Sequence, residues 1–339
     1  MSTASPPVAP SAPDQEAYGA QGRSPWLDVD WREHQRWITV GGRPLNVVEL
    51  GSGDPIVFVH GLSGSWQNWL EQLPVFAEHH RVIAFDLPGF GQSPMPDEEI
   101  SIPGYGRVVR GLLAKLGIDR AVLVGNSMGG FIAAEVAIQF PKLVERLVLV
   151  SAAGLTVEHL RDEQILRVLR ALERRVTAWS GWLAAHSDVL VRRRRTRFAL
   201  LSIVAAHPAR LPPALAAEQL HGAGAPGFVD GLDALTDYPI RDRLPGIEAP
   251  TLIVWGEKDR LVPVRDAFEF ERLIPDARKV IYRDTGHVAM LERPAAFNAL
   301  LDEFLHEAPG DRVDAAHRDV PGPELSEAEA RAQAADPAD

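Results

Sequence analysis

The fold of this chain is decided by the stretch R-A-V-L-V-G-N-S-M-G-G-F-I-A-A-E-V-A-I-Q-F, which runs from Arg120 to Phe140. The apolar, β-branched run 121–124 predicts a buried strand. The small and apolar residues after the glycines recur at helical spacing until Pro141, which predicts a helix. Between strand and helix stands G-x-S-x-G, whose glycines allow a turn tight enough to lift the Ser127 hydroxyl above a sheet. This order of elements indicates a nucleophilic serine, with a surface serine in a Gly-rich turn as the alternative.

The composition excludes several classes of chemistry. The 339 residues suffice for one large α/β domain with an insertion, and 46% hydrophobic and 24% charged residues are typical of a soluble globular protein. The chain has no cysteine, so disulfides, thiol nucleophiles, cysteine-based zinc sites and iron–sulfur clusters are excluded. A formal charge of −11 argues against general nucleic-acid binding, which requires a basic surface.

The N-terminal residues and the longest apolar run bear on where in the cell the protein is located. The N-terminal residues lack the basic and apolar regions of a secretory signal. The longest nearly unbroken apolar run, 198–206, is about half of the roughly 18 residues that a membrane span requires. We therefore expect a cytoplasmic protein. Nothing in the sequence indicates its oligomeric state.

The chain divides into a core, an insertion and two tails. Residues 1–24 are rich in Pro, Ala and Ser and predict a disordered leader, and the acidic residues 308–339 predict a disordered tail. Residues 25–154 and 239–307 alternate strand and helix patterns and form the predicted core. Residues 155–238 have no strand signal and carry apolar residues at helical spacing, which predicts a helical cap inserted over the strand ends.

Strand and helix patterns alternate at short spacing in the core, which predicts βαβ units and a mainly parallel sheet with helices on both faces. The first two strands, separated by two glycines, are expected to form an antiparallel hairpin. The expected strands are 37–40, 45–50, 56–59, 82–85, 121–124, 147–150, 251–255 and 280–282, and the main expected helices are 66–78, 102–116, 264–273 and 294–306. The carboxyl ends of parallel strands are where ligands bind, and His60, Asp86 and Ser127 all follow such ends.

A serine hydroxyl needs a neighbouring base, and the base needs an orienting acid. Among eleven histidines, His287 alone follows the last expected strand in a loop freed by a glycine. Asp259 follows the strand 251–255, and it is preferred as the acid over Glu257, which lies closer to the strand, and Glu158, which lies far beyond its own. The alternatives are a solvated loop histidine and a charge at a helix N-terminus.

The oxyanion formed on attack needs backbone N–H donors already in place. We expect one from Met128, the residue after the nucleophile, and the other from Leu62, in the loop after the strand that ends at His60.

These marks together resemble the α/β-hydrolase fold enzymes over about residues 35–306. The marks are His60-Gly61, D-L-P-G-F-G-Q-S from Asp86, G-N-S-M-G-G, W-G-E-K-D-R-L-V-P from Trp255 and G-H-V-A-M-L-E-R-P from Gly286. The resemblance implies a mainly parallel eight-stranded sheet with helices on both faces and a helical lid over 155–238. It also implies a triad of Ser127, Asp259 and His287, with Leu62 and Met128 as oxyanion donors, and no cofactor.

Within that superfamily, G-N-S-M-G-G is similar to the hydrolases that cleave carbon–carbon bonds in meta-cleavage products of aromatic degradation. This chain departs from them at Leu62-Ser63-Gly64-Ser65, where they usually carry G-P-G, and at Val288, where they usually carry Trp. We therefore expect hydrolysis of a small or medium apolar carboxylic ester, with carbon–carbon bond hydrolysis of a diketone and a non-catalytic ligand receptor as alternatives. The histidines show no H-x-H or H-x-x-x-H pairing, and no metal site is expected.

Ten arginines against five acidic residues make 155–208 basic within an acidic chain. The simplest interpretation is a solvated helix face. The sharper hypotheses are that Arg192, Arg193, Arg194, Arg195 or Arg197 attracts a carboxylate-bearing substrate, or that this segment, with Trp179 and Trp182, makes weak contact with an anionic membrane surface.

Overall fold

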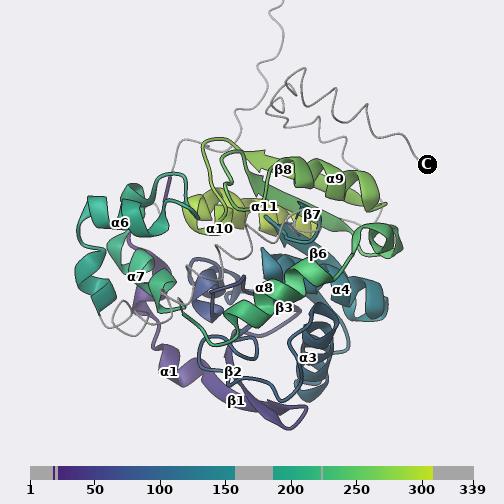
Figure 1. Cartoon of the computed structure of the whole chain (residues 1–339). Coiled ribbons are helices and arrows are strands. Elements are labelled where there is room, and N and C mark those ends of the chain that lie inside the picture. The colour runs from purple at the N-terminus through teal and green to yellow at the C-terminus, as the bar shows by residue number, and fades with distance from the viewer. Residues whose placement is uncertain (1–17, 20–21, 157–185, 223, 308–339) are drawn as a thin grey trace, which may run out of the picture.

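The computed structural model of the protein, which describes residues 18–19, 22–156, 186–222 and 224–307, is built around a single eight-stranded sheet (Figure 1). The order of strands across the sheet is β1-β2-β4-β3-β5-β6-β7-β8. The strands are β1 (Gln35–Val40), β2 (Arg43–Leu50), β3 (Pro55–Val59), β4 (Arg81–Phe85), β5 (Ala121–Asn126), β6 (Val144–Val150), β7 (Thr251–Gly256) and β8 (Ala277–Tyr282).

The direction of the strands brings the starts of three loops together. The pairs β1–β2 and β2–β4 are antiparallel, and every other pair is parallel. Val59 of β3 pairs with Phe85 of β4 on one side and Gly125 of β5 on the other. The loops that follow β3, β4 and β5 therefore leave the same edge of the sheet at the same level. This confirms the predicted mainly parallel sheet with an antiparallel hairpin at one edge.

Alternate residues of each strand enter two separate cores, as the two-residue period of a strand requires. Val57 and Val59 pack with the helices α3 and α4, whereas Ile56 and Phe58 pack on the opposite face with α2 and α11. The sheet is therefore covered on both sides, which agrees with its nearly continuous apolar strands. The helices of the core are α1 (Trp31–His34), α2 (Leu73–Phe76), α3 (Ile102–Lys115), α4 (Met128–Gln139), α9 (Arg265–Leu273), α10 (Ala289–Glu292) and α11 (Pro294–His306), with 3₁₀ turns η1 (Pro25–Asp28), η2 (Trp66–Trp69), η3 (Pro141–Leu143) and η6 (Arg241–Gly246).

The single helix expected over 66–78 is instead two short pieces, η2 and α2. Pro74 stands in the first turn of α2 and cannot donate an N–H to a preceding helical turn. The proline therefore starts a new helix in place of continuing the old one, and the periodicity of the apolar residues did not reveal that break.

The described residues between β6 and β7 contain helices and no strand, as the pattern predicted. Besides η6, they are α6 (Arg194–Leu201), η5 (Pro208–Arg210), α7 (Pro213–His221) and α8 (Phe228–Asp237). In Figure 1, α6 and α7 lie to one side of the sheet and α8 crosses in front of it. Residues 157–185, which include Glu158, Trp179 and Trp182, lie outside the described part of the chain.

Packing at the N-terminus begins earlier than the composition predicted. The expected leader reached residue 24, yet Tyr18 is 7% exposed and Ser24 is 6% exposed. An aromatic ring with a hydroxyl can be buried where Pro, Ala and Ser cannot drive burial, and Tyr18 is the first such residue in the chain. The remaining expected disordered residues, 1–17 and 308–339, lie outside the described part.

No helix within the described ranges combines the length and apolarity needed to cross a membrane.

Candidate active site

The turn between β5 and α4 holds Ser127 in a strained conformation. Ser127 has φ 55° and ψ −118°, in the left-handed half of backbone space that residues other than glycine rarely adopt. Its N–H donates to Val150 O at 2.9 Å, and its carbonyl accepts from the N–H groups of Phe131 and Ala153, each at 3.1 Å. These three bonds hold a partly buried serine at the N-terminus of α4.

Two glycines are required for that turn. A Cβ at Gly125 would overlap the carbonyl oxygen of Gly129, and a Cβ at Gly129 would overlap the carbonyl oxygen of Val59. The first turn of α4 therefore lies directly against the ends of β5 and β3, which leaves the serine at the tip of a sharp turn.

Leu62 and Met128 both lie beside this turn. Met128 provides the first amide of α4, and the first N–H groups of a helix have no partner within it. The loop after β3 passes close to Ser127, since a Cβ at Gly61 would lie 3.1 Å from the Ser127 Cβ. A Cβ at Gly231 of α8 would lie 2.9 Å from Leu62 Cδ1 and 3.5 Å from Met128 Sδ. The helix α8 thus packs against the side chains of both residues.

His60 fixes the loop that carries Leu62, a role that its place in the sequence did not reveal. The His60 ring is completely buried, and its Nε2 accepts from the Leu87 N–H at 2.9 Å. The proton of the ring must therefore sit on Nδ1, which lies 2.8 Å from Gly61 O and donates to it. Burial lowers the pKa of His60, and the nearby Asp86 carboxylate opposes that shift. The neutral ring joins the loop after β3 to the loop after β4.

Asp86 holds the second of these loops through its carboxylate. It accepts from the Trp66 N–H at 2.9 Å, the Asn46 side-chain amide at 2.8 Å and the Gln92 N–H at 2.8 Å. The D-L-P-G-F-G-Q-S motif is therefore a scaffold around His60, which its spacing alone did not show.

His287 and Asp259 are in direct contact. His287 Nδ1 lies 2.8 Å from Asp259 Oδ2, and the two side chains are 5% and 0% exposed. Asp259 Oδ1 accepts from the N–H groups of Leu261 and Val262 at 2.8 and 3.0 Å. With one oxygen held by backbone donors and the other facing the ring, the carboxylate can hold a proton on Nδ1 and leave Nε2 free to accept one.

The backbone of His287 is tied to the serine turn. The side-chain amide of Asn126 donates to Val150 O at 3.1 Å and to His287 O at 3.3 Å. Asn126 directly precedes Ser127, so the loop of His287 is anchored at the end of β5. No hydrogen bond joins the Ser127 hydroxyl to the imidazole among the described residues. Such bonds are often long until a substrate is in place.

The other candidate acids are placed differently. Glu257 is exposed and its Oε2 accepts from the Asp284 N–H at 3.1 Å, away from the imidazole. Glu158 is outside the described residues. Within the described ranges no group of three or more His, Asp and Glu side chains is arranged to hold a metal ion.

The arginines of the insertion fall into two groups. Arg192, Arg193, Arg194 and Arg195 are exposed. Arg197 is only 5% exposed, and its guanidinium donates to Ala209 O at 2.9 Å, to Arg192 O at 3.3 Å and to Val191 O. Arg197 therefore joins segments of the insertion, a contact that makes it a poor candidate for binding a substrate carboxylate.

The family model for the alpha/beta hydrolase fold matches residues 54–294. The chain is 32% identical over 282 residues to the 2-hydroxy-6-oxo-2,4-heptadienoate hydrolase of Pseudomonas putida, covering 80% of this chain and 95% of that relative. A solved meta-cleavage product hydrolase is 26% identical with a TM-score of 0.63, covering 82% of this chain and 100% of the other. A solved enzyme described as degrading N-acyl homoserine lactones is 29% identical with a TM-score of 0.64, covering 79% and 100%.

Proposed function

The chain belongs to the alpha/beta hydrolase family and is a hydrolytic enzyme, and we propose that it hydrolyses a carbon–carbon bond in a 2-hydroxy-6-oxo-dienoate through Ser127, Asp259 and His287. The observation that carries the choice of reaction is the match along 95% of the length of a heptadienoate hydrolase. The buried His287–Asp259 pair at the serine turn supports the choice of residues.

In this proposal Ser127 attacks the 6-oxo carbonyl while His287 takes the hydroxyl proton. Asp259 keeps the imidazole in the useful tautomer and stabilises the imidazolium that forms. The amides of Leu62 and Met128 donate to the oxyanion. The surroundings of Leu62 support that assignment, because His60 fixes its loop and α8 packs on its side chain.

The bond that breaks lies between the carbonyl carbon and the adjacent carbon of the dienol. Before that bond breaks, a proton moves from the 2-hydroxyl group to this adjacent carbon, which becomes tetrahedral while C2 becomes a carbonyl. The electron pair of the breaking bond then passes through the remaining double bond to the C2 oxygen, and the dienolate takes the proton held by His287 and departs. The acyl group stays on Ser127 until a water molecule, deprotonated by His287, releases it as a carboxylic acid. The net reaction consumes one water, and the conjugation of the leaving group replaces the alkoxide stability on which ester cleavage depends.

A direct comparison of substrates tests the proposal. Loss of the dienoate absorbance and release of p-nitrophenol from esters of increasing chain length would be measured on the same preparation, with Ser127→Ala as the control. We expect a higher kcat/KM for the dienoate and loss of both activities in Ser127→Ala. An enzyme that turns over only esters would refute the carbon–carbon reaction and leave the assignment of the triad intact.

Hydrolysis of a carboxylic ester or lactone is the second candidate. Two observations favour it: Val288 stands where the carbon–carbon hydrolases usually carry Trp, and the lactone-degrading structure is similar at 29% identity. The same residues would act, with the alcohol leaving in place of the dienoate. The panel above distinguishes the two reactions.

We further propose that the described helices of the insertion cover the site and shape the substrate space. The position of α8 supports this proposal, because a Cβ at Gly231 would lie 3.2 Å from Phe90 Cζ and 2.9 Å from Leu62 Cδ1. Substitution of Gly231 by Ala would then change the relative kcat/KM of short and long substrates more than it changes the melting temperature.

A further inference from the structure

We propose that Tyr18 and Glu292, here called the clasp, position His287 by tying its loop to the helical insertion and to the N-terminal segment. The proposal rests on the proposed function, because a positioned imidazole matters only if His287 is the base. Tyr18 and Glu292 lie 274 residues apart in the chain and are joined by a hydrogen bond of 2.5 Å between the tyrosine hydroxyl and Glu292 Oε2.

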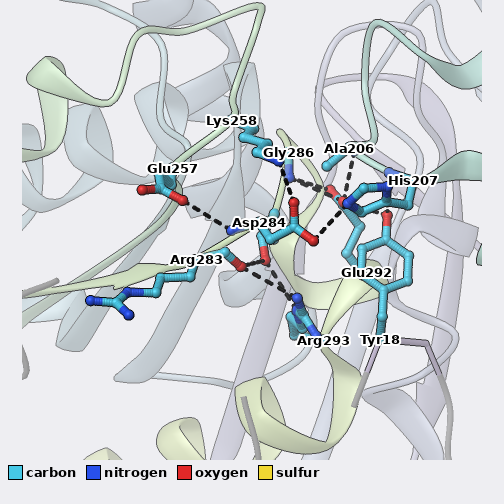
Figure 2. A network of polar contacts seen from close by, with 11 residues as sticks. Tyr18, Ala206, His207, Glu257, Lys258, Arg283, Asp284, Gly286, Glu292 and Arg293 are labelled. Atoms are coloured by element: carbon cyan, nitrogen blue, oxygen red, sulfur yellow. Dashed lines mark hydrogen bonds and ion pairs between the residues drawn. The ribbon is translucent and has the colours of Figure 1, made fainter. Parts of the chain in front are cut away.

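Glu292 is a completely buried carboxylate at which three segments meet (Figure 2). Its Oε2 accepts from the Ala206 N–H at 2.8 Å, and its two oxygens accept from the Gly286 N–H at 2.9 and 3.0 Å. Burial raises the pKa of Glu292, and the hydrogen bonds from Tyr18 and from these amides oppose that rise. Every partner named is a donor, which suits a carboxylate and would not suit an amide in its place.

Tyr18 closes the clasp from the side of the N-terminus. Its hydroxyl also accepts from the His207 N–H at 2.9 Å, and the guanidinium groups of Arg210 and Arg293 lie 4.9 and 5.0 Å from the centre of its ring. The Gly19 N–H donates to the carbonyl oxygen of Glu292 at 2.7 Å. A single hydroxyl therefore bridges the buried carboxylate and the backbone of the insertion.

The clasp reaches His287 through the residue before it and through the His287 N–H. Gly286 precedes His287, and the His287 N–H itself donates to Val204 O at 2.9 Å, in the same short segment that carries Ala206. A Cβ at Gly286 would lie 2.7 Å from the Ala206 nitrogen, so the backbone of the loop lies directly against the backbone of the insertion. A change at the clasp therefore moves the backbone to which the imidazole is attached.

The same loop carries further strain and charge. Asp284 has φ 51°, and it pairs with His207 Nε2 at 2.7 Å and with the Lys258 ammonium group. Figure 2 shows these contacts converging on the loop from the insertion and from the end of β7. A residue held at a positive φ returns to an ordinary backbone conformation when the contacts that hold it are removed. A shift of about 1 Å at a catalytic group can lower the rate by as much as about a hundredfold.

The test compares two Tyr→Phe variants in the full chain. Tyr18→Phe removes the hydroxyl of the clasp. Tyr238→Phe is the matched control, because the Tyr238 hydroxyl likewise donates to a buried glutamate, Glu135, at 2.8 Å, and an arginine lies 5.3 Å from its ring centre. Glu135 does not contact the loop of His287, so the control removes the same kind of bond at another place.

The principal readout is the rate at which a fluorophosphonate labels Ser127, since labelling needs the imidazole but no particular substrate. We expect Tyr18→Phe to label about tenfold more slowly. In turnover of whichever substrate is active, kcat should fall with little change in KM. Hydrogen exchange at Gly286 and Ala206 should accelerate. Tyr238→Phe should keep the labelling rate and kcat.

The outcomes separate the two proposals. A wild-type chain whose Ser127 is not labelled refutes the triad, and the clasp with it. A labelled wild-type chain with an unchanged rate in Tyr18→Phe, or an equal loss in both Tyr→Phe variants, overturns the clasp and leaves the triad standing. Glu292→Gln provides a second variant, expected to label about a hundredfold more slowly because its amide would face two donors. If that variant fails to fold, Tyr18→Phe alone decides.

Discussion

Asp259→Asn provides the sharpest test of the proposed triad, because the structure dictates how the asparagine must sit. Oδ1 of Asp259 accepts from two backbone N–H groups, those of Leu261 and Val262. Only the oxygen of an asparagine side chain can take that place, since its NH₂ group would meet two other donors. The NH₂ group must then face His287 Nδ1, at the position now occupied by Oδ2 at 2.8 Å.

An NH₂ group facing Nδ1 needs an acceptor there, so the neutral ring must carry its proton on Nε2. That tautomer cannot take the proton of Ser127, which is the step that makes the hydroxyl a nucleophile. A wrong tautomer in a serine hydrolase lowers kcat by about 10⁴-fold. This loss corresponds to roughly 5.5 kcal/mol of transition-state stabilisation, at about 1.36 kcal/mol for each factor of ten.

The assay is kcat for the preferred substrate, with melting temperature as a check on the fold. Glu257→Gln is the matched control, because it neutralises a nearby acid that is exposed and does not touch the ring. We expect the control to keep kcat within about twofold, since exposed charges are weakly coupled to buried ones. Activity of Asp259→Asn within tenfold of wild type would refute the assignment of Asp259, and an equal loss in the control would refute the argument from the tautomer.

Three further predictions concern the scaffold and the surface. Gly129→Ala should lower the free energy of unfolding by about 3 kcal/mol, because its Cβ would overlap Val59 O. Gly246→Ala should be nearly neutral, because its Cβ would meet nothing within 4 Å, and thermal unfolding compares the two variants. Burial lowers the pKa of His60 in the folded state below 6.5, so that below this pH the unfolded chain binds one proton more than the folded chain. The free energy of unfolding should therefore fall as the pH drops below about 6.5. Denaturant titrations should show a smaller dependence on pH in His60→Gln. Replacing all four residues 192–195 with Gln should leave kcat/KM for a carboxylate-bearing substrate within about twofold of wild type, because these side chains are exposed. Binding to anionic vesicles should also be unchanged. A tenfold loss of either would show that these arginines recruit a ligand or a membrane.

The elements of the core were predictable because each carries its own local signal. The run 121–124 predicted a strand, and β5 extends it by two residues to Asn126. Pro141 ended the following helix as predicted, with α4 closing at Gln139. The eight apolar runs became eight strands, and the inner strands β3 to β7 are nearly continuous apolar runs because they are buried on both faces. The expected sites followed from the rule that ligands gather at the carboxyl ends of parallel strands.

The contacts among the loops could not be predicted in the same way. The place of His60 after a strand does not reveal its role, and the Leu87 N–H that donates to its Nε2 shows that the ring is a neutral bridge. The break between η2 and α2 was missed because apolar residues continue across it at helical spacing. In each case the deciding partner is distant in sequence or lies on the backbone, and neither leaves a pattern in the residue types.

The loop of His287 contains both a residue that the sequence singled out and contacts that it could not predict. Its histidine was predicted as the base from its place after the last strand, whereas the two buried carboxylates that hold the loop are recognised only by the groups that donate to them. Asp259 faces the ring and accepts from the loop after β7, whereas Glu292 faces the backbone of Gly286 and accepts from the insertion. Burying two carboxylates destabilises the fold unless each is fully hydrogen-bonded. The presence of both, one bonded to the ring of His287 and the other to the backbone of the preceding residue, is explained if the position of that imidazole matters more to this protein than the stability an apolar loop would add.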